Sequence, residues 1–348
     1  RPGIDAVDDD DRDLDHRAAG LAEHLDGAAR RAHIFYLEHC RVLVNGGRVE
    51  YVTDSKRAAH YWNIPLANTT TILLGTGTSI TQAAMRDLSR AGVVVGFCGG
   101  GGTPLFSAGD RDIEIEWQLP QSEYRETQYL QRWCQFWFDE SQRLAAAKYL
   151  QHLRLDYLLL NYTGNPQLKQ QGWAVDLPAI KQRIDSSRQI IRAAPNQAHL
   201  LTEEGRLTEF LYAQAVRCTG FSAFDKRAKH GTGVDLANQF LDHGNYLAYG
   251  LAASALWTLG IPHAFPVLHG KTRRGALVFD IADIIKDGLI LPQAFLAARD
   301  GVSGNKFRQL CIELLVDSQA LDTMIESIKL ILKQTLGQRD RRQDDANT

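Results

Sequence analysis

The sequence predicts an α+β protein with a small β-rich N-terminal domain followed by a larger all-helical C-terminal domain. Between residues 33 and 105 the apolar residues form short runs separated by turn residues, as in strands. From about residue 120 almost to the end they recur at the spacing of amphipathic helices. At 348 residues, with 44% hydrophobic and 23% charged residues, the chain can bury the core that this fold needs.

Four segments are expected along the chain. Residues 1–32 form an acidic tail with a possible short helix, and residues 33–110 form the β-rich domain. Residues 111–337 form the helical domain, and residues 338–348 form a second charged tail. The first fifteen residues hold seven aspartates and two arginines, so the rest of the chain is +3 although the formal total is −2. A surface for a polyanion must therefore come from local clusters of cations.

The β-rich domain begins with "CRVLVNGGRVEYV", which alternates around Asn45-Gly46 and predicts a hairpin. Two further strands are predicted at "TTTILL" (69–74) and "GVVVGFC" (92–98). The segment between them predicts a helix with Ser79 as its N-cap and Gly92 just beyond its end.

The loop "GTGTSI" lies between a predicted strand and a predicted helix, as a dinucleotide-binding fingerprint does. Ile80 occupies the position of the third glycine, so the fingerprint is incomplete. Tight turns at Gly75 and Gly77 are the favoured interpretation over a nucleotide-binding module.

The cysteines are far apart and form no CxxC pair, which favours reduced packing residues in a cytoplasmic protein over a disulfide framework or a zinc site. No apolar run reaches the roughly 18–20 residues that span a bilayer. We therefore expect no membrane segment. The cysteines are Cys40, Cys98, Cys134, Cys218 and Cys311.

The stretch "PHAFPVLHGKTRRGALVFDIADIIKDG" (262–288) combines His269, a cluster of cations, and two acids three residues apart. In one interpretation Asp280 is a helix N-cap with Asp283 in the first turn, where the helix dipole favours acids. In the other, the stretch supplies half of a site for a metal ion and a polyanion. The residues alone leave both interpretations open.

The segment "LTEEGRLTEFLYAQ" predicts a second helix with Thr202 as N-cap and with Glu203 and Glu204 in its first turn. Gly205 lies inside this helix, where glycine costs roughly 0.5–1 kcal/mol relative to alanine. The glycine hints at close approach by another backbone or a ligand.

Three motifs together resemble the CRISPR-associated adaptation integrase, a metal-dependent DNA endonuclease that inserts new spacers into CRISPR arrays. They are "EEGR" (203–206), "HGNYLAYG" (243–250) and "HGKTRRGALVFDIADIIK" (269–286). Motifs in the N-terminal half, such as "YWNIPLANTTTILLGTGTSITQAAMR", resemble the type I-F branch of this family. The resemblance covers about residues 33–300 and implies the same division into β-rich and helical domains.

The resemblance also implies a catalytic site. Glu204, His269 and Asp283 match the family's divalent-metal ligands, and Asp280 matches a nearby assisting carboxylate. Asn245 matches an asparagine that is expected to contact the metal ligands without binding the metal itself. Two carboxylates and an imidazole suit Mg²⁺ or Mn²⁺. His269 could be a ligand, a proton relay, or both.

Two basic runs are expected to contact DNA phosphates, although each could instead be a solvated loop. The helix around "RWCQFWF" contains aromatic residues that could stack bases. A packed core or a dimer contact is the favoured use of Trp133, Phe136 and Trp137. The expected DNA-binding residues are Lys226, Arg227, Lys229, Lys271, Arg273 and Arg274.

The activity that the resemblance implies is the joining of 3′-OH ends of prespacer duplex DNA into the CRISPR repeat by transesterification. Attack by water at the same site would nick or trim DNA. The implied partners are the prespacer and repeat–leader DNA, a second copy of the chain in a homodimer, and a second adaptation protein. In the type I-F branch that protein is fused to the interference helicase-nuclease. The alternatives are a structure-selective DNA repair nuclease and a non-catalytic DNA-binding subunit.

Overall fold

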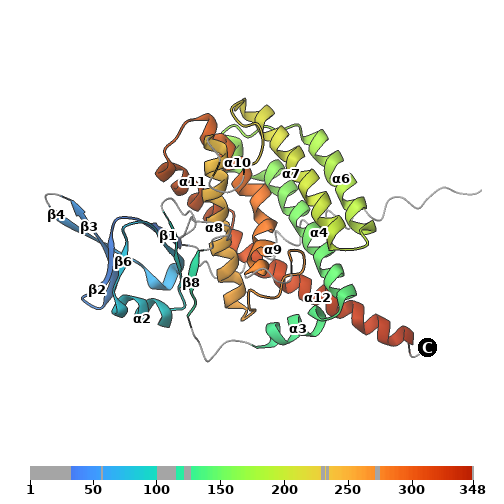
Figure 1. Cartoon of the computed structure of the whole chain (residues 1–348), viewed down its shortest axis with the longest axis horizontal. Coiled ribbons are helices and arrows are strands. Elements are labelled where there is room, and N and C mark those ends of the chain that lie inside the picture. Colours follow the sequence, from blue (N-terminus) through green and yellow to red (C-terminus); the bar gives the residue numbers. More distant parts are fainter. Residues whose placement is uncertain are drawn as a thin grey trace, which may run out of the picture. The chain divides into compact units, whose positions relative to one another are not determined.

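The computed structural model describes residues 33–55, 58–99, 115–120, 127–228, 232, 235–270 and 275–346. The predicted fold class is confirmed, because strands occupy the N-terminal part and helices the remainder (Figure 1). All five cysteine thiols are free, as expected. In the described ranges no helix is long and apolar enough to cross a membrane. The expected acidic segment 1–32 and the expected domain boundary at residues 110–111 lie outside these ranges.

The strands form two four-stranded sheets. Sheet A has three parallel strands and a final antiparallel one, in the order β1 (His33–Leu37), β5 (Thr69–Leu74), β7 (Val94–Phe97) and β8 (Glu116–Gln118). Sheet B has the order β4 (Ala58–Asn63), β3 (Arg48–Ser55), β2 (Arg41–Asn45) and β6 (Ser79–Ile80). The strands predicted at 69–74 and 92–98 are therefore present. Strand β8 belongs to sheet A although it falls within the range expected to be helical.

Strand β5 is buried along its whole length because both faces of sheet A are covered. Ile72 contributes to a core shared with sheet B, whereas Leu73 contributes to the large core of the helices. On the helical side, the Thr71 hydroxyl hydrogen bonds to that of Ser254 in helix α8 (Leu236–Thr258). A strand that is covered on both faces does not alternate between apolar and polar residues, and β5 accordingly ends in three successive apolar residues, Ile72, Leu73 and Leu74.

The predicted hairpin is present, but its turn is displaced by one residue. Asn45 pairs with Arg48 as the last residue of its strand, so the two-residue loop is formed by Gly46 and Gly47. Both glycines have positive φ, at 55° and 79°. Such a turn matches the right-handed twist of the two strands that it joins.

Helix α2 (Gln82–Arg90) begins later than predicted. Thr81 is the N-cap, and its side chain accepts a hydrogen bond from the Ala84 amide. Ser79, the expected cap, pairs with β2 as part of strand β6. Ser79 and Thr81 both precede this helix and carry a hydroxyl that could cap it. Because Ser79 pairs with β2, Thr81 is the residue that caps the helix. Gly92 follows the helix end with a φ of 79°, as expected.

The other helices form the second part of the molecule. Helix α8 contacts β5 and β7 on one side and α9, α10, α11 and α12 on the other, so it lies between sheet A and most of the helices (Figure 1). The remaining elements are α3 (Gln128–Trp137), α4 (Glu140–Gly164), α5 (Pro166–Gln170), α6 (Leu177–Ala193), α7 (Gln197–Thr219), α9 (Ala276–Ile285), the π-helical turn η4 (Lys286–Ile290), α10 (Leu291–Arg299), α11 (Gly304–Asp317) and α12 (Ala320–Ala346). The C-terminal segment expected to be a tail is therefore helical to Ala346.

Helix α9 is buried on nearly every side against α4, α8 and α12. Apart from Asp280 and Asp283, its sequence "ALVFDIADII" is entirely apolar, as expected for a helix that is buried on most sides. The helix follows Gly275, whose φ is 72°, and so begins four residues before Asp280. The predicted N-cap position of Asp280 and first-turn position of Asp283 are therefore wrong. Both carboxylates are buried inside the protein, with exposed fractions of 0% and 2%.

Helix α7 also begins earlier than predicted. Asn196 is its N-cap and accepts a hydrogen bond from the His199 amide. Thr202, the expected cap, lies within the helix and donates its hydroxyl hydrogen to the carbonyl of Ala198. Glu204 is consequently an interior residue of a long helix, with helical turns before and after it that hold its backbone in place.

The aromatic residues of α3 support the segment that precedes His269. Trp133 and Phe136 are fully buried, which confirms the expected packed core. The indole of Trp133 donates to the Phe265 carbonyl at 3.0 Å, and that of Trp137 donates to the Pro266 carbonyl at 2.7 Å. These bonds hold the loop between α8 and α9 in place.

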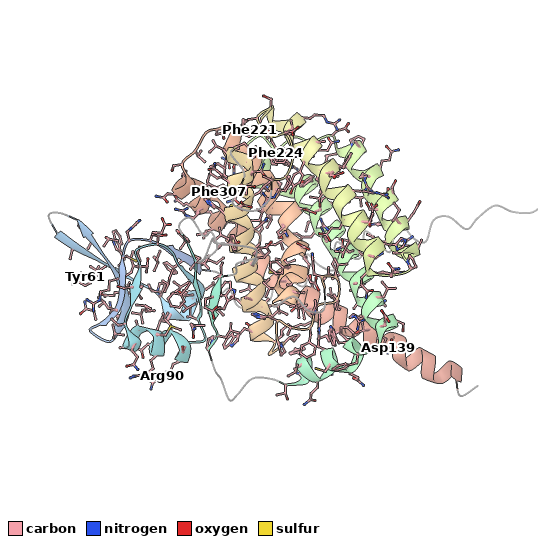
Figure 2. All side chains as sticks on the ribbon, in the orientation of Figure 1. Tyr61, Arg90, Asp139, Phe221, Phe224 and Phe307 are labelled. Carbon is pink, nitrogen blue, oxygen red and sulfur yellow. The ribbon has the colours of Figure 1, made fainter. Side chains whose placement is uncertain are left out.

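Strand β4 is the outer strand of sheet B. Its Tyr61 and Trp62 side chains are each 54% exposed, and Figure 2 shows Tyr61 on the side away from the helices. Exposed aromatic side chains on an edge strand are typical of a surface that contacts another chain.

His263, in the loop between α8 and α9, makes stability depend on pH. Burial lowers its pKa from 6.5 to about 4, and its Nε2 atom has no hydrogen-bond partner in the described structure. Because the unfolded chain takes up this proton more readily, stability is lost as the pH falls from 6.5 towards 4. We expect a loss of about 2 kcal/mol by pH 5 from this residue. Denaturant titrations of the parent and of His263→Leu at pH 7.5 and pH 5 measure it, and equal losses in both proteins would contradict it.

Candidate metal centre

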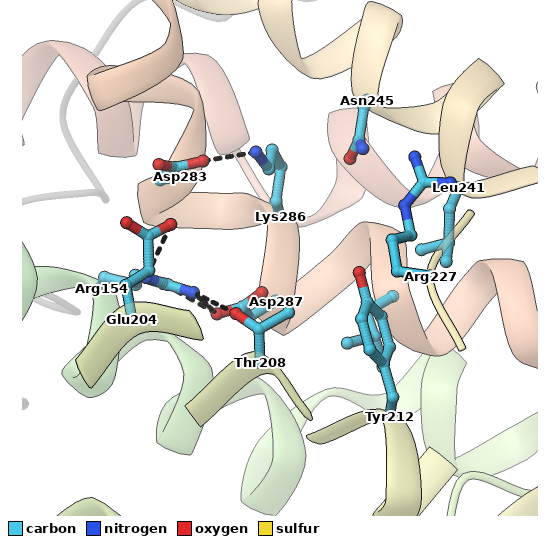
Figure 3. A pocket seen from close by; sticks show the side chains of 11 residues that line it. Arg154, Glu204, Thr208, Tyr212, Arg227, Leu241, Asn245, Asp283, Lys286 and Asp287 are labelled. Carbon is cyan, nitrogen blue, oxygen red and sulfur yellow. Dashed lines mark hydrogen bonds and ion pairs between the residues drawn. The ribbon is translucent and has the colours of Figure 1, made fainter. Parts of the chain in front are cut away.

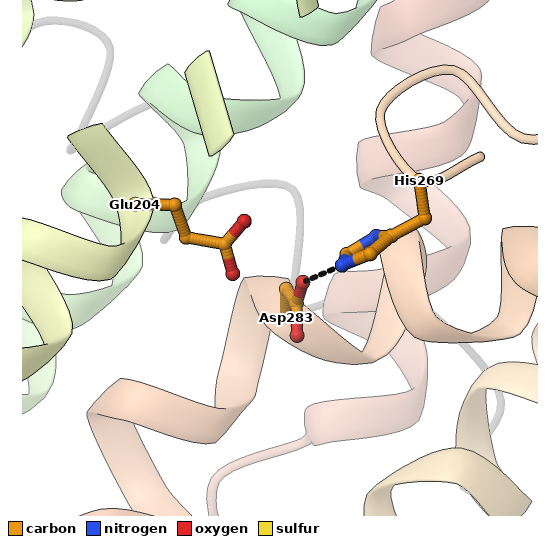
Figure 4. A group of neighbouring side chains, drawn as sticks. All are labelled: Glu204, His269 and Asp283. Carbon is orange, nitrogen blue, oxygen red and sulfur yellow. Dashed lines mark ion pairs between the residues drawn. The ribbon is translucent and has the colours of Figure 1, made fainter. Parts of the chain in front are cut away.

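Three side chains from separate segments face one another at the centre of the helical part (Figure 4). They are Glu204 of α7, His269 of the loop before α9, and Asp283 of α9. One ligand atom from each lies within 4.8 Å of the other two. Ligands on opposite sides of a magnesium ion are about 4.2 Å apart. A small side-chain movement would therefore bring all three within coordination distance of one ion.

Asp280 fixes the orientation of His269. One carboxylate oxygen of Asp280 accepts the ring Nδ1 hydrogen at 2.6 Å and the backbone amide of His269 at 3.0 Å. The other oxygen accepts the amides of Val267 and Leu268 at 2.6 and 3.1 Å. With Nδ1 protonated and bound in this way, Nε2 keeps its lone pair and lies 3.9 Å from an oxygen of Asp283. The expected assisting role of Asp280 is consistent with this geometry.

Asp283 presents one free oxygen to the cluster. Its Oδ1 forms an ion pair with Lys286, one helical turn further on. Its Oδ2 is buried and has no hydrogen-bond partner among the described residues. A buried carboxylate oxygen without a partner is costly, because it has lost its water without compensation. This oxygen lies on the side where the three ligands meet.

Glu204 is held by Arg154 of α4, a guanidinium that is only 2% exposed. The Nη1 atom of Arg154 lies 3.3 Å from Glu204, and its Nε donates to Asp287 at 2.7 Å. Thr208 accepts a further bond from the same guanidinium at 3.1 Å. One buried cation therefore fixes a carboxylate of α7 and a carboxylate of η4 relative to each other.

The pKa values of the three side chains show how closely they interact. Burial, followed by the negative charge of Asp283, raises the pKa of Glu204. Burial alone would raise the pKa of Asp283 as well, but the charges of Lys286 and His269 outweigh it and lower that pKa. Burial opposes protonation of His269, yet its hydrogen bond to Asp280 and the charge of Asp283 prevail and raise its pKa.

The site fits a divalent cation on three counts. Two carboxylates and a neutral imidazole are a donor set that Mg²⁺ and Mn²⁺ accept. The imidazole is held by a carboxylate behind it, which is the usual arrangement of a metal-bound histidine. The Oδ2 atom of Asp283, which accepts no hydrogen bond among the described residues, would coordinate a cation held between the three side chains.

A cavity of about 180 Å³ opens beside Glu204 and Asp283. The charged groups of Arg154, Lys286 and Arg227 reach it from different elements, and the Tyr212 hydroxyl and Asn245 amide point toward it (Figure 3). Asn245 therefore lines the same cavity as Glu204 and Asp283, and its supporting role stays a prediction.

Of the six cations expected to contact DNA, two lie in the described structure. Arg227 lines the cavity, forms an ion pair with Asp242, and donates to Asn238 at 2.9 Å. The backbone carbonyl of Lys226 accepts a hydrogen bond from the Asn238 side chain at 3.0 Å. The remaining four lie outside the described residues and are Lys229, Lys271, Arg273 and Arg274.

Sequence reasoning missed three residues of the site. Lys286 follows the "DIAD" motif by three residues, the spacing of a helical ion pair, and so could have been found. Thr208 follows Glu204 by four residues and lies on the same face of α7. Arg154 carries no signal, since an arginine in a long helix is ordinarily exposed.

Comparison with known protein families gives a match over most of the chain. The family model described as "CRISPR associated protein Cas1" matches residues 37–328. A CRISPR-associated endonuclease Cas1 of Pseudomonas aeruginosa is 60% identical over 301 residues, which is 86% of this chain and 93% of the relative. The CRISPR-associated endonuclease Cas1 of Pectobacterium atrosepticum is 50% identical over 86% of this chain and 92% of its own length.

Solved structures share the fold at low sequence identity. A TtCas1–DNA complex superposes with a TM-score of 0.59 at 21% identity, covering 86% of this chain and 91% of the other. A casposase bound to integration product gives 0.65 at 14% identity, with coverages of 86% and 91%. A Cas6-RT-Cas1–Cas2 complex gives 0.62 at 14% identity, covering 90% of this chain and 36% of the other.

Proposed function

The chain belongs to the Cas1 family of CRISPR-associated proteins, and from this premise we propose that it is a divalent-metal-dependent DNA endonuclease and integrase. The family resemblance read from the sequence is thereby confirmed, and the similarity to the Pseudomonas relative is consistent with the type I-F branch. The reaction is the joining of 3′-OH ends of prespacer DNA into the CRISPR repeat. The convergence of Glu204, His269 and Asp283 is the observation that carries the proposal.

Each side chain has a defined task in this reaction. Glu204, Asp283 and the Nε2 atom of His269 would hold Mg²⁺ or Mn²⁺. When bound, the ion supplies a Lewis acid that polarises the phosphodiester and favours ionisation of the attacking hydroxyl. Asp280 keeps His269 in the tautomer that leaves Nε2 free. Arg154 keeps Glu204 in place and offsets part of the negative charge of the two carboxylate ligands.

The DNA contacts come from cations around the centre. Arg227 and Lys286 line the cavity next to the ligands, where a phosphate adjoining the reacting one can lie. Lys226, Lys229, Lys271, Arg273 and Arg274 are proposed as further phosphate contacts because of their positive charge. Phosphate contacts of this kind give affinity that falls with salt and does not depend on sequence.

The proposed partners follow from the family. Solved relatives include a DNA complex and a complex that contains Cas2, so we expect DNA and a second adaptation protein to bind this chain. A homodimer is also expected, and the exposed Tyr61 and Trp62 on β4 offer a surface for a protein contact. The second protein is expected to be fused to the interference helicase-nuclease, and the reaction to take place in the cytoplasm.

His269→Ala tests the proposal. Loss of Nε2 removes a ligand without removing a phosphate contact, so we expect joining of a labelled duplex to a supercoiled repeat plasmid in Mn²⁺ to fall by at least about tenfold. DNA affinity in a filter-binding assay should change little. Equal joining by parent and variant would refute the site. Repeat-independent cleavage of DNA junctions would favour a repair nuclease, and unchanged DNA binding without any metal response would favour a non-catalytic subunit.

A further inference from the structure

We infer that Gly205 and Gly270 leave open the path by which a DNA phosphodiester backbone reaches the metal centre, an inference that rests on the proposed function. Each glycine directly follows a ligand, Glu204 in one case and His269 in the other. Both glycines are exposed. Each glycine is therefore an exposed position next to a ligand in the chain, one in helix α7 and one in the loop before α9.

Neither glycine is required by the packing or backbone of the described protein. A Cβ atom built on Gly205 or Gly270 meets no described heavy atom within 4 Å, and neither has a positive φ. Other glycines of the chain differ, since a Cβ on Gly244 would lie 2.5 Å from Ile290 and one on Gly96 would lie 2.7 Å from Trp117. At Gly244 and Gly96, neighbouring atoms of the protein itself therefore explain why a larger side chain is excluded.

The position of Gly205 makes its identity the more informative of the two. It lies inside the 23-residue helix α7, far from either end. Glycine is the least favourable residue in a helix interior apart from proline, because it adds backbone freedom to the unfolded chain. An exposed glycine with free space around it therefore lowers stability and provides no contact within the described protein. A ligand that must approach the helix closely accounts for it.

The buried oxygen of Asp283 gives an independent indication of a ligand here. This Oδ2 atom has no hydrogen-bond partner, and its residue is only 2% exposed. The Asp283 carboxylate faces the side chains of Glu204 and His269 (Figure 4). A phosphate oxygen that shares an ion with Glu204 lies within about 4 Å of the Glu204 carboxylate. On this inference the DNA backbone passes the exposed surface of α7 next to Glu204, where a side chain at position 205 would occupy the open space that glycine leaves.

The proposal predicts opposite effects of Gly205→Ala on stability and activity. Alanine improves the helix, so the melting temperature should rise by about 2 °C. DNA joining should nevertheless fall, by about threefold with alanine and by tenfold or more with the longer side chain of Gly205→Leu, as expected for a steric series. Mn²⁺ affinity, measured by calorimetry without DNA, should stay within about twofold of the parent because no ligand is changed. A purely structural role for Gly205 would not separate these three measurements.

Gly164 provides the matched control. It is an exposed residue of helix α4 whose Cβ position is also free of described neighbours, and it lies outside the ligand cluster. Gly164→Ala and Gly164→Leu should leave joining unchanged. Full joining by Gly205→Leu, with Glu204→Gln inactive in the same assay, would overturn this inference and leave the proposed function standing. Full joining by Glu204→Gln would instead overturn the proposed function. Weaker Mn²⁺ binding by Gly205→Leu would also overturn the inference, since the variant would then act on the ligands.

Discussion

Replacing Glu204 with glutamine is expected to reduce DNA joining and nicking by more than about 10²-fold while the protein stays folded. Glutamine keeps the shape of the side chain but removes the negative charge that a divalent ion requires. The fold persists because Arg154 retains its hydrogen bond to Asp287 at 2.7 Å. Duplex affinity is expected to change by less than about threefold, since phosphate contacts supply most of it. The measurements are turnover in Mn²⁺, a duplex-binding titration, and thermal unfolding.

Glu209→Gln is the control for this variant. Glu209 is an exposed residue of the same helix, so the same change of charge occurs there away from the ligand cluster. It should retain the activity of the parent. If Glu204→Gln and Glu209→Gln joined DNA at the same rate, Glu204 would not be a metal ligand and the catalytic assignment would fall.

Replacing Arg154 with methionine is expected to lower the free energy of unfolding by about 3–5 kcal/mol. The guanidinium is 2% exposed and pairs with Asp287 and Glu204, so its removal leaves two carboxylates in a region from which water is excluded. Burial alone would lower the pKa of Arg154, but the charges of Asp287 and Glu204 outweigh it and raise that pKa, so the guanidinium keeps its charge. Guanidinium chloride titration gives the change directly.

Two further variants show whether charge or size is responsible. Arg192→Met makes the same substitution at an exposed position of α6 and should change stability by less than about 0.5 kcal/mol. Arg154→Lys keeps the charge but loses the forked geometry, and it should lie between the parent and Arg154→Met. A loss below about 1 kcal/mol for Arg154→Met would show that water or rearranged neighbours compensate the carboxylates.

The sequence predicted a β-rich part followed by a helical part because burial imposes a period on apolar residues, but it did not predict strands β1, β4, β6 and β8. Strand β5 is buried on both faces, and its sequence "TTTILL" accordingly shows no alternation of apolar and charged residues. Helix starts were harder to predict. Helix α9 begins after Gly275, which offers no capping side chain, so the acid at position 280 was the natural but mistaken choice. For α7, both Asn196 and Thr202 are acceptable caps, and only the tertiary packing selects Asn196.

The site was harder to predict than the fold. Glu204, His269 and Asp283 are far apart in the chain, and no local pattern states that α7, the 262–270 loop and α9 meet. Only the resemblance of several motifs to one family identified them together. Neither the local sequence pattern nor the family resemblance identified Arg154. Its charge is buried because carboxylates of α7 and η4 become its neighbours, and that happens only after folding.

Strand β5 contributes to two hydrophobic cores, and this determines where the polypeptide can be truncated. Ile72 and Leu73 belong to different cores, and the hydroxyl contact from Thr71 to Ser254 joins sheet A to α8. A shortened protein that kept only the helices would expose to water the face of α8 that now packs on β5 and β7. Such a fragment is expected to aggregate rather than survive as an autonomous catalytic module. Truncation and domain-exchange designs should therefore keep the strands and helices on one polypeptide.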